Sequence, residues 1–311
     1  MRLGDRELPL SQYVALDPER VCRRSLPLLL KILDPLPEPI RGDLYLETHD
    51  TKHEVYVVTR VDPEAWPDGR GGVRLGVDQA LRGTAASDSQ FRDSFLAAVC
   101  AYERVRRAID DATAGAEEHA SEPELRAAMN RFTSIRRLAV GDVVQVAPGL
   151  PHALQHGVRV FEFQTPTYER NIISFAQRVV SQPHWDSEYA ITRATLDAAP
   201  EPAIEPVQTL PQARVERIAA FSDFEVQRLT VSGHGQIALD WYPDTTPYSM
   251  VAACSGEWRL DALTLGAECA AFIPACATTC TLVNQTAETQ TALLALPLPH
   301  TAGNIDAVDA S

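Results

Sequence analysis

Three side chains able to bind a metal ion lie within eight residues near position 50. They are Glu47, His49 and Glu54, in the stretch LYLETHDTKHEVYVV of residues 44–58. Apolar and aromatic residues flank them on both sides, as is typical of β-strands. Because side chains of a strand alternate between two faces, Glu47 and His49 share one face. A turn at residues 50–52 is predicted to fold Glu54 back beside them, as the second strand of a hairpin.

A fourth candidate ligand lies about a hundred residues further along the chain, a separation that only folding can close. His152 ends the run GDVVQVAPGLPH and follows Gly149 by three positions. Imidazole and carboxylate ligands suit Zn²⁺, Fe²⁺ or Mn²⁺, and four protein ligands still leave room for substrate oxygens. Glu47 and His49 taken alone also fit a solvated stripe on an antiparallel sheet. Four such residues together favour a metal site.

Composition narrows the classes of partner. The chain has 311 residues, 45% of them hydrophobic, and a formal net charge of −14. This acidity argues against nucleic acid or an anionic membrane as the partner, since both attract clustered Lys and Arg. The N-terminus lacks the apolar stretch of a signal peptide, and no run approaches the ~18 apolar residues of a membrane span. We expect a cytoplasmic protein that binds a small, polar ligand, and its oligomeric state stays open.

The candidate strands are interrupted by a helical pattern. The run LPLLLKILD, residues 26–34, predicts a buried strand that enters a turn at Pro35. Apolar residues then recur at helical spacing from Phe91 to Ile109. A second helix is expected to start at a capping box beginning with Ser121, after a flexible acidic connection at residues 112–120. We therefore predict a helical insertion at about 88–136 in a β-rich domain.

The C-terminal third has a different pattern. Residues 198–212 are rich in proline and are interpreted as a linker or covering segment. Short strand-like runs with turn signals between them follow, which predicts a second β-sandwich or barrel. The stretch GAECAAFIPA weakly repeats GDVVQVAPG, but no His corresponds to His152. The sequence thus favours one domain at 1–197 with the metal site, and another at 198–311 without metal ligands.

The spacing of the four candidate ligands resembles that of a known superfamily. Glu47-x-His49 followed by Glu54 is similar to the first cupin motif, with Glu in place of its first His. Gly149-Leu-Pro-His152 is similar to the Gly-x-x-His end of the second cupin motif. This resemblance implies a mainly β fold of two cupin-like β-barrels, a bicupin, with the helical insertion in the first barrel.

A closer resemblance is to the type I phosphomannose isomerases (mannose-6-phosphate isomerases). The segments LPLLLKILD, LETH, TKHE, GDVVQVAPGLPHAL and EFQ before an Arg occur in the order found in that family. The helical insertion and the second β-rich half correspond as well. The similarity covers most of the chain, from about residue 26 onward. It implies a metal-dependent isomerase that acts on a sugar or sugar phosphate.

The resemblance also implies roles for individual residues. Glu47 and His49 correspond to the family's Gln-x-His, Glu54 to the end of its Lys-x-Glu, and His152 to its second-motif His, so these four would bind zinc. The residues that match positions of catalytic or pocket-lining groups in the family are Lys52, Arg170, Glu162 and Gln164. The implied reaction is aldose–ketose isomerisation through an enediol, with a base moving the proton and cations stabilising the oxyanion.

The sequence departs from the family at the places that recognise substrate. Glu47 replaces the family's Gln, and Tyr45 replaces a Ser that contacts phosphate. The Lys that follows the Arg in the family has no counterpart after Arg170. An unphosphorylated sugar is therefore a second substrate class. Two alternatives to an isomerase also remain, an Fe²⁺-dependent dioxygenase and a sugar-binding cupin without catalysis.

Overall fold

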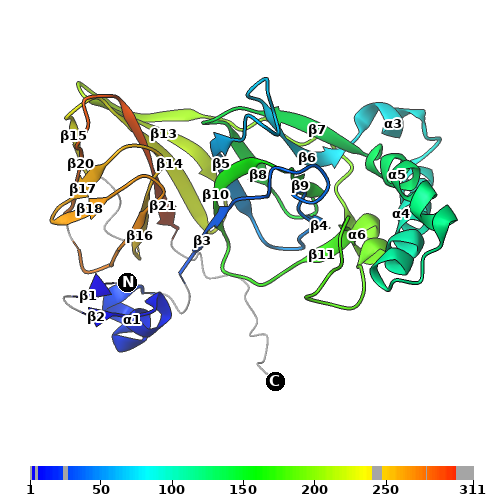
Figure 1. Ribbon diagram of the computed structural model, residues 1–311. Coiled ribbons are helices and arrows are strands. Elements are labelled where there is room, and N and C mark those ends of the chain that lie inside the picture. Colours follow the sequence, from blue (N-terminus) through cyan, green and yellow to red (C-terminus); the bar gives the residue numbers. More distant parts are fainter. Residues whose placement is uncertain (1, 4–5, 24–26, 240–246, 278, 299–311) are drawn as a thin grey trace. The chain divides into compact units, whose positions relative to one another are not determined.

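The protein is described here by a computed structural model that covers residues 2–3, 6–23, 27–239, 247–277 and 279–298 (Figure 1). The chain forms two compact units. One comprises Leu29–Pro202, and the other combines the preceding residues with those from Ala203 onward. The sequence analysis placed the first residues with the metal-binding domain, whereas their contacts group them with the C-terminal strands. One such contact is the hydrogen bond donated by Ala275 N to Val21 O.

Two antiparallel sheets build the Leu29–Pro202 unit. The first has the order β3 (Leu29–Leu33), β10 (Val158–Gln164), β5 (Glu54–Val61) and β8 (Val143–Val146). The second has the order β11 (Asn171–Ser174), β4 (Leu46–Thr48), β9 (His152–Leu154), β6 (Gly71–Val77) and β7 (Thr133–Leu138). The mainly β prediction is confirmed. The ladders of residues 29–202 form separate sheets and do not join into a closed barrel, so the cupin barrel stays a prediction.

The two sheets share a buried apolar core. Val58, Val144 and Val160 of the first sheet pack in one cluster with Val73 and Leu154 of the second. These strands are rich in β-branched residues, which pack well on a pleated surface. Removing such side chains from water contributes about 1.5–3 kcal/mol for each fully buried one. The core thus holds the inner faces of both sheets together, and the candidate ligands lie on those faces.

The predicted hairpin at residues 44–58 is wrong. β4 belongs to the second sheet, where it pairs with β11 and β9, while β5 belongs to the first, where it pairs with β10 and β8. The segment between them crosses from one sheet to the other. A strand pairs with whatever partner buries its face best, so closeness in sequence does not decide the pairing. Glu54 therefore meets His49 from the opposite sheet.

The helical insertion begins earlier and ends earlier than predicted. It contains α3 (Gln79–Thr84), α4 (Asp88–Asp110) and α5 (Ala116–Asn130), and residues 133–138 already form β7. α5 also starts within the stretch interpreted as a flexible connection, because Glu118 reaches back to accept a hydrogen bond from Gly115 N at 2.9 Å. Ser121 and Pro123 lie inside this helix. A proline there removes one helical hydrogen bond without ending the helix.

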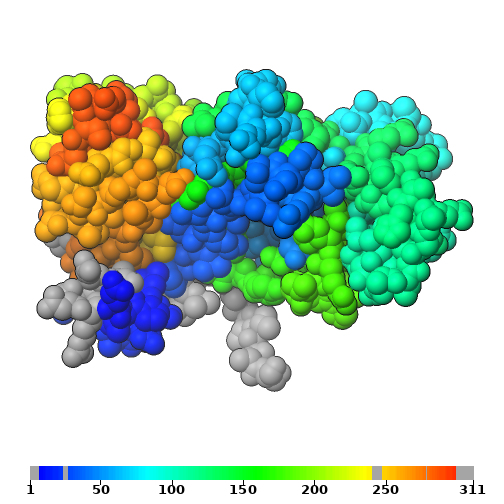
Figure 2. Space-filling view, in the orientation of Figure 1, coloured from blue at the N-terminus to red at the C-terminus, as the bar shows by residue number. Residues whose placement is uncertain are grey.

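The helices cover the outer face of the second sheet. Phe95, Val99 and Tyr102 form a stripe along α4 that packs against Leu46 of β4 and Ala153 of β9. α6 (Ser187–Arg193) adds to the same cluster. In Figure 2 the segment of α3, α4 and α5 lies together as the cyan-to-green part of this unit. The second sheet is thus covered on both faces, by the other sheet and by helices.

The run LPLLLKILD forms a less buried strand than predicted. β3 pairs only with β10 and lies at the edge of its sheet. Leu29 and Ile32 are exposed, and the other residues of β3 are only partly buried. An edge strand has one neighbour instead of two, so apolar composition alone overstated its burial.

The second unit is also built mainly of antiparallel strands. Its sheets have the orders β12-β13-β14-β21-β16-β19 and β15-β20-β17-β18, around one apolar core. Their bounds are β12 (Glu205–Leu210), β13 (Ala213–Ala220), β14 (Phe224–Val231), β15 (Gln236–Ala238), β16 (Ser249–Ala253), β17 (Trp258–Leu260), β18 (Leu263–Leu265), β19 (Ala270–Ile273), β20 (Thr281–Asn284) and β21 (Gln290–Pro297). Four N-terminal elements complete it: β1 (Arg2–Leu3), β2 (Arg6–Glu7), α1 (Leu10–Leu16) and α2 (Pro18–Val21). Among the described residues, no helix has the length and apolar character needed to span a membrane.

Candidate metal centre

Glu47, His49 and His152 are brought together by strand pairing. Glu47 of β4 lies directly opposite His152 of β9 in the antiparallel register. Directly opposite residues project their side chains to the same face of a sheet. His49 follows Glu47 by two residues, and one potential ligand atom from each of the three lies within 4.8 Å of the others. The predicted alternation therefore held for this part of the site.

A glycine turn delivers His152 to this position. Gly149 has φ of +76°, in the left-handed region that favours glycine, and an added Cβ would lie 2.9 Å from Thr195 Oγ1. Its backbone N–H donates to His49 O at 2.7 Å, which ties the two histidine segments together. The His152 ring is oriented by a contact of 2.9 Å between Nδ1 and Leu150 O. A carbonyl acceptor at Nδ1 leaves Nε2 with its lone pair free for a metal.

Glu54 enters the same centre from the other sheet. Its Oε1 lies 3.2 Å from His49 Nε2, and its Oε2 lies 3.4 Å from His152 Nε2. The two imidazole rings meet edge to face, with centroids 4.8 Å apart. Glu54 thus contacts both histidines, while Glu47 approaches them from the side of β4. The structure brings together all four residues that the sequence analysis proposed as ligands.

Several buried atoms of this centre have no hydrogen-bond partner among the residues that the structure describes. They include both ring nitrogens of His49, Nε2 of His152 and Oε2 of Glu47. The side chains of His49, Glu54 and His152 are at most 3% exposed. Buried polar atoms are normally satisfied, and each exception calls for an explanation. Two imidazoles and one carboxylate with such unpaired atoms, beside the carboxylate of Glu54, are a set that a divalent cation fits.

Burial and mutual contact shift the pKa values of these groups. Burial lowers the pKa of His49, and the neighbouring Glu54 only partly offsets it. Burial also acts to lower the pKa of His152, but the carboxylates of Glu54 and Glu47 outweigh it and raise that pKa. For Glu54, burial is outweighed by the two imidazoles, and its pKa lies well below the ordinary 4.5. Glu54 is therefore a carboxylate at neutral pH, which is the form that binds a metal.

Lys52 and Tyr56 complete the surroundings of Glu54. Lys52 Nζ lies 2.7 Å from Glu54 Oε1, and its side chain is only 7% exposed, unlike a lysine at a solvated hairpin tip. Tyr56 donates a hydrogen bond of 2.7 Å to Glu54 Oε2. Burial and the charges of Glu54 and Glu162 hold the pKa of Tyr56 well above its usual value, so its phenol stays protonated. Each oxygen of Glu54 thus has one polar neighbour besides a histidine.

Glu162 lies in a polar row across the first sheet. It is directly opposite Tyr56 of β5 on one side and Lys31 of β3 on the other. Lys31 Nζ donates to Glu162 Oε1 at 3.0 Å and also to Gln164 Oε1. Burial, with the nearby charge of Glu54, raises the pKa of Glu162 to about 7 despite the two lysines. A carboxyl group with that pKa exchanges protons at neutral pH.

Arg170 forms an ion pair with Glu47. Its Nε lies 3.0 Å from Glu47 Oε2, an ion pair that is not aligned as a hydrogen bond. The guanidinium also stacks over the Tyr45 ring, 4.8 Å from its centroid, and Tyr45 packs against Phe175. The Arg170 side chain is 30% exposed and that of Glu47 is 17% exposed. This is the more open side of the centre.

Two residues of the centre were missed by the sequence analysis. Lys31 bonds Glu162, and Tyr56 bonds Glu54. Both had a signal in the sequence. Lys31 is the one charged residue amid the apolar run 26–33, and Tyr56 follows Glu54 by two positions and so shares its face.

Comparisons with known proteins find similar folds but no similar sequence. No family model matches the chain, and no curated protein matches its sequence. Among solved structures, mannose 6-phosphate isomerase from Bacillus subtilis is similar, with a TM-score of 0.64 and 13% sequence identity. The match covers 94% of this chain and 83% of the Bacillus subtilis chain. The fold is that of the phosphomannose isomerases. A variant of phosphomannose isomerase from Salmonella typhimurium gives a TM-score of 0.63 at 13% identity, over 95% and 86% of the two chains.

We expect the pH dependence of stability to report the unusual state of Glu162. Its pKa is raised from 4.5 to about 7, so the folded state binds this proton more tightly than the unfolded state. The stabilisation of the folded state by protonated Glu162 is then fully present below about pH 4.5 and is lost as pH rises to about 7. In metal-free protein, the free energy of unfolding is expected to fall between pH 5 and 8 by about 2–3 kcal/mol less in Glu162→Gln than in the wild type.

Urea unfolding of the wild type and of Glu162→Gln at the two pH values, in the presence of a chelator, measures this difference. The histidines titrate in both proteins and cancel in the comparison. Glu201→Gln is the matched control, since Glu201 is 84% exposed. Parallel pH profiles for the wild type and Glu162→Gln would contradict the raised pKa.

Proposed function

We propose that this protein is a metal-dependent aldose–ketose isomerase that acts on mannose 6-phosphate and fructose 6-phosphate or on a related sugar. Glu47, His49, Glu54 and His152 are the proposed ligands, and zinc is the proposed ion, with Fe²⁺ or Mn²⁺ as alternatives. The observation that carries the proposal is the group of buried imidazole nitrogens without hydrogen-bond partners in the described part of the chain, in a fold shared with phosphomannose isomerases. We also propose that the two sheets of each unit correspond to the two sides of a cupin-type barrel.

The surrounding residues supply the groups that this isomerisation needs. A proton must move between C1 and C2 of the sugar through an enediol, and Glu162 has a pKa of about 7 that suits both taking and returning it. Its Oε1 accepts from Lys31, which leaves Oε2 for the substrate proton. A metal ion bound by the four ligands would polarise the sugar oxygen. Lys52 and Arg170 are the cations proposed to stabilise negative charge on that oxygen.

The proposed function is tested with metal-loaded protein and a sugar panel. Purified protein is reconstituted with zinc, its metal content is measured, and conversion of mannose 6-phosphate to fructose 6-phosphate is followed by chromatography. Free mannose and lyxose are tested in parallel, because Tyr45 departs from the family at a phosphate-contacting position. Turnover of any of these sugars, lost when the metal is removed, is the expected result. Stoichiometric metal without turnover of any sugar would overturn the proposal.

One observation favours a second function. Glu47, His49 and His152 form a group of two histidines and one carboxylate, the ligand set of many Fe²⁺ oxygenases. An Fe²⁺-dependent dioxygenase is therefore the alternative proposal. Iron in the native protein together with oxygen uptake would select it, whereas zinc without oxygen uptake favours the isomerase. Sugar-induced thermal stabilisation without turnover would instead indicate a non-catalytic sugar-binding protein.

A further inference from the structure

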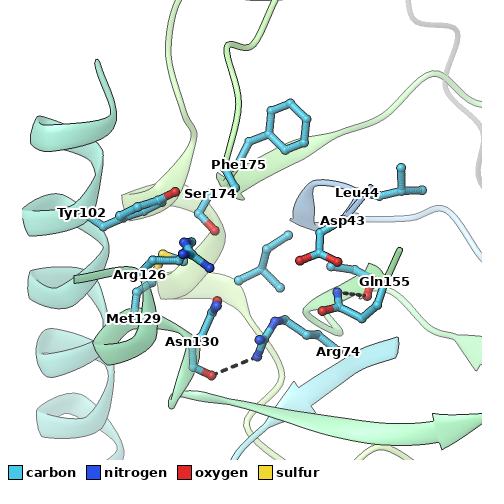
Figure 3. Close-up of a pocket in the computed structure, with 13 residues that line it drawn as sticks. Asp43, Leu44, Arg74, Tyr102, Arg126, Met129, Asn130, Gln155, Ser174 and Phe175 are labelled. Atoms are coloured by element: carbon cyan, nitrogen blue, oxygen red, sulfur yellow. Dashed lines mark hydrogen bonds between the residues drawn. The ribbon is translucent and has the colours of Figure 1, made fainter. Parts of the chain in front are cut away.

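A cavity lined by both polar and apolar side chains lies on the opposite side of the second sheet from the candidate metal centre. Its lining includes Ala153 of β9. Gln155, which follows β9, lies across the cavity from Tyr102 of α4 and Met129 of α5 (Figure 3). His152 and Ala153 are successive residues of β9 and so point to opposite faces of the sheet. A molecule at the metal centre is therefore separated from this cavity by the sheet itself.

Arg74 contributes free hydrogen-bond donors to the cavity. Its Nη1 donates to Asn130 O and to Thr133 Oγ1, both at 3.1 Å. Within the part of the chain that the structure describes, its Nε and Nη2 have no hydrogen-bond partner, yet they are not among the fully buried unpaired atoms. They are thus within reach of a molecule in the cavity. Burial lowers the pKa of Arg74, and the positive charge of Arg126 contributes to this shift.

Arg126 of α5 supplies a second guanidinium. Its Nε donates to Glu122 Oε1 at 3.0 Å, and its two terminal nitrogens have no partner among the described residues. Figure 3 shows Arg126 and Asn130 on the helical side of the cavity, with the Arg74 side chain extending toward Asn130. Two guanidiniums beside one partly buried cavity repel each other unless an anion lies near both.

Neutral donors line the same cavity. Ser174 is only 3% exposed, and its hydroxyl makes no hydrogen bond within the described residues. The side-chain amide of Asn130 is also without a described partner, since only its backbone oxygen accepts from Arg74. A hydroxyl, an amide and two guanidiniums are the donor types that bind the oxygens of phosphate.

The acidic groups near the cavity are already engaged. Asp43 Oδ1 accepts from His156 N at 3.0 Å and contacts His156 Nδ1 at 2.7 Å. Glu122 accepts from both Arg126 and Tyr102 through Oε1. The charge of Asp43 still acts on Arg74, so the cavity is less positive than its two arginines alone suggest. Among the lining residues Arg74, Arg126 and Asp43 one positive charge is in excess, and Glu122 offsets it as the ion-pair partner of Arg126.

From this arrangement we propose that the cavity is a binding site for a tetrahedral oxyanion, a phosphate group held by Arg74 and Arg126 with Ser174 and Asn130. The cavity offers about 30 Å³ to the centres of water-sized groups, which is room for a small polar group. The side chains of Arg126 and Asp43 are 20% and 26% exposed, so solvent reaches its rim. The phosphate therefore comes either from free phosphate or from an ester whose remainder lies outside. This site does not depend on the proposed isomerase activity.

Titration calorimetry with inorganic phosphate tests the proposal on full-length protein, with a chelator present so that no metal offers a competing site. Saturable binding to the wild type is expected. Arg126→Gln is expected to weaken it at least about tenfold, because a charge-assisted hydrogen bond is lost. Arg107→Gln is the matched control and is expected to leave the affinity within about twofold, within ordinary surface effects. Arg107 forms the same type of helical ion pair, with Glu103, outside the cavity.

A second variant tests phosphate binding independently, in case replacing Arg126 disturbs the structure. Asn130→Asp places a carboxylate among the donors and keeps the backbone oxygen that Arg74 uses, so it is expected to abolish phosphate binding with circular dichroism unchanged. Displacement of phosphate by a hexose 6-phosphate, but not by the free hexose, would support a phosphate ester as the ligand. Binding of phosphate without such displacement would support free phosphate. Equal affinities of Arg126→Gln and Arg107→Gln, or no saturable binding up to about 10 mM, would overturn the proposal.

Discussion

Replacing His152 by alanine is expected to remove the metal from this protein and, with it, the proposed isomerase activity. His152 is one of two imidazoles in the candidate centre, and its Nε2 has no hydrogen-bond partner among the described residues. Losing a residue that only hydrogen-bonds to a metal ligand typically lowers metal affinity about 10–100-fold. Losing a ligand itself is therefore expected to lower the affinity by more than about 100-fold. The His152 side chain is 2% exposed. Metal analysis after dialysis, and competition with a chromogenic chelator, measure the loss.

His156→Ala is the matched control for this prediction. His156 lies four residues further on and contacts Asp43 through Nδ1, away from the group formed by Glu47, His49 and His152. The control should therefore retain metal at the wild-type level. Retention of stoichiometric metal by His152→Ala would contradict the proposed ligand set, even if that variant had lost activity.

Replacing Glu54 by glutamine is expected to destabilise the metal-free protein by about 3–5 kcal/mol. Glu54 is 3% exposed and lies 2.7 Å from Lys52 Nζ, whose side chain is 7% exposed. The amide keeps the size of the side chain but removes the charge that Lys52 and the two histidines face. A buried cation without a counter-charge is costly, whereas removing both members of a buried pair is often nearly neutral. The double variant Lys52→Met/Glu54→Gln should therefore recover much of the loss.

Urea unfolding of the single and double variants in a chelator measures this coupling without a contribution from bound metal. Asp34→Asn is the control, since Asp34 pairs with Arg60 where both side chains are about half exposed, at 44% and 54%. An exposed pair of this kind contributes about 0–1 kcal/mol. If Glu54→Gln cost no more than Asp34→Asn, Lys52 and Glu54 would not act as a buried ion pair.

The sequence predicted which residues come together in the candidate metal centre, but not which strands bring them there. The identities of Glu47, His49, Glu54 and His152 follow from residue type and spacing. The shared face of Glu47 and His49 follows from the period of a strand. What failed was the hairpin, because β4 and β5 pair with β9 and β10 instead of with each other. Spacing along a chain says little about which strands bury each other's faces.

For the helices, too, the sequence predicted one feature correctly and another wrongly. The apolar spacing from Phe91 onward predicted α4 because a helical stripe is a local property that repeats every 3.6 residues. The boundaries of α5 were wrong because the Glu118 contact to Gly115 decides where it starts. In the sequence, Glu118 three residues after Gly115 indicates a helix start less strongly than the capping-box pattern that begins at Ser121.

Residue types, alternation and the order of motifs determined by themselves that this chain is mainly β and carries four potential metal ligands. These are local properties, and any fold that buries the apolar residues must respect them. Only the tertiary structure decided that Lys52 is buried against Glu54, that Arg170 faces Glu47, and that Arg74 and Arg126 line one cavity. Each of these depends on which surfaces pack together. Packing is set by the whole core at once, and no short stretch of sequence encodes it.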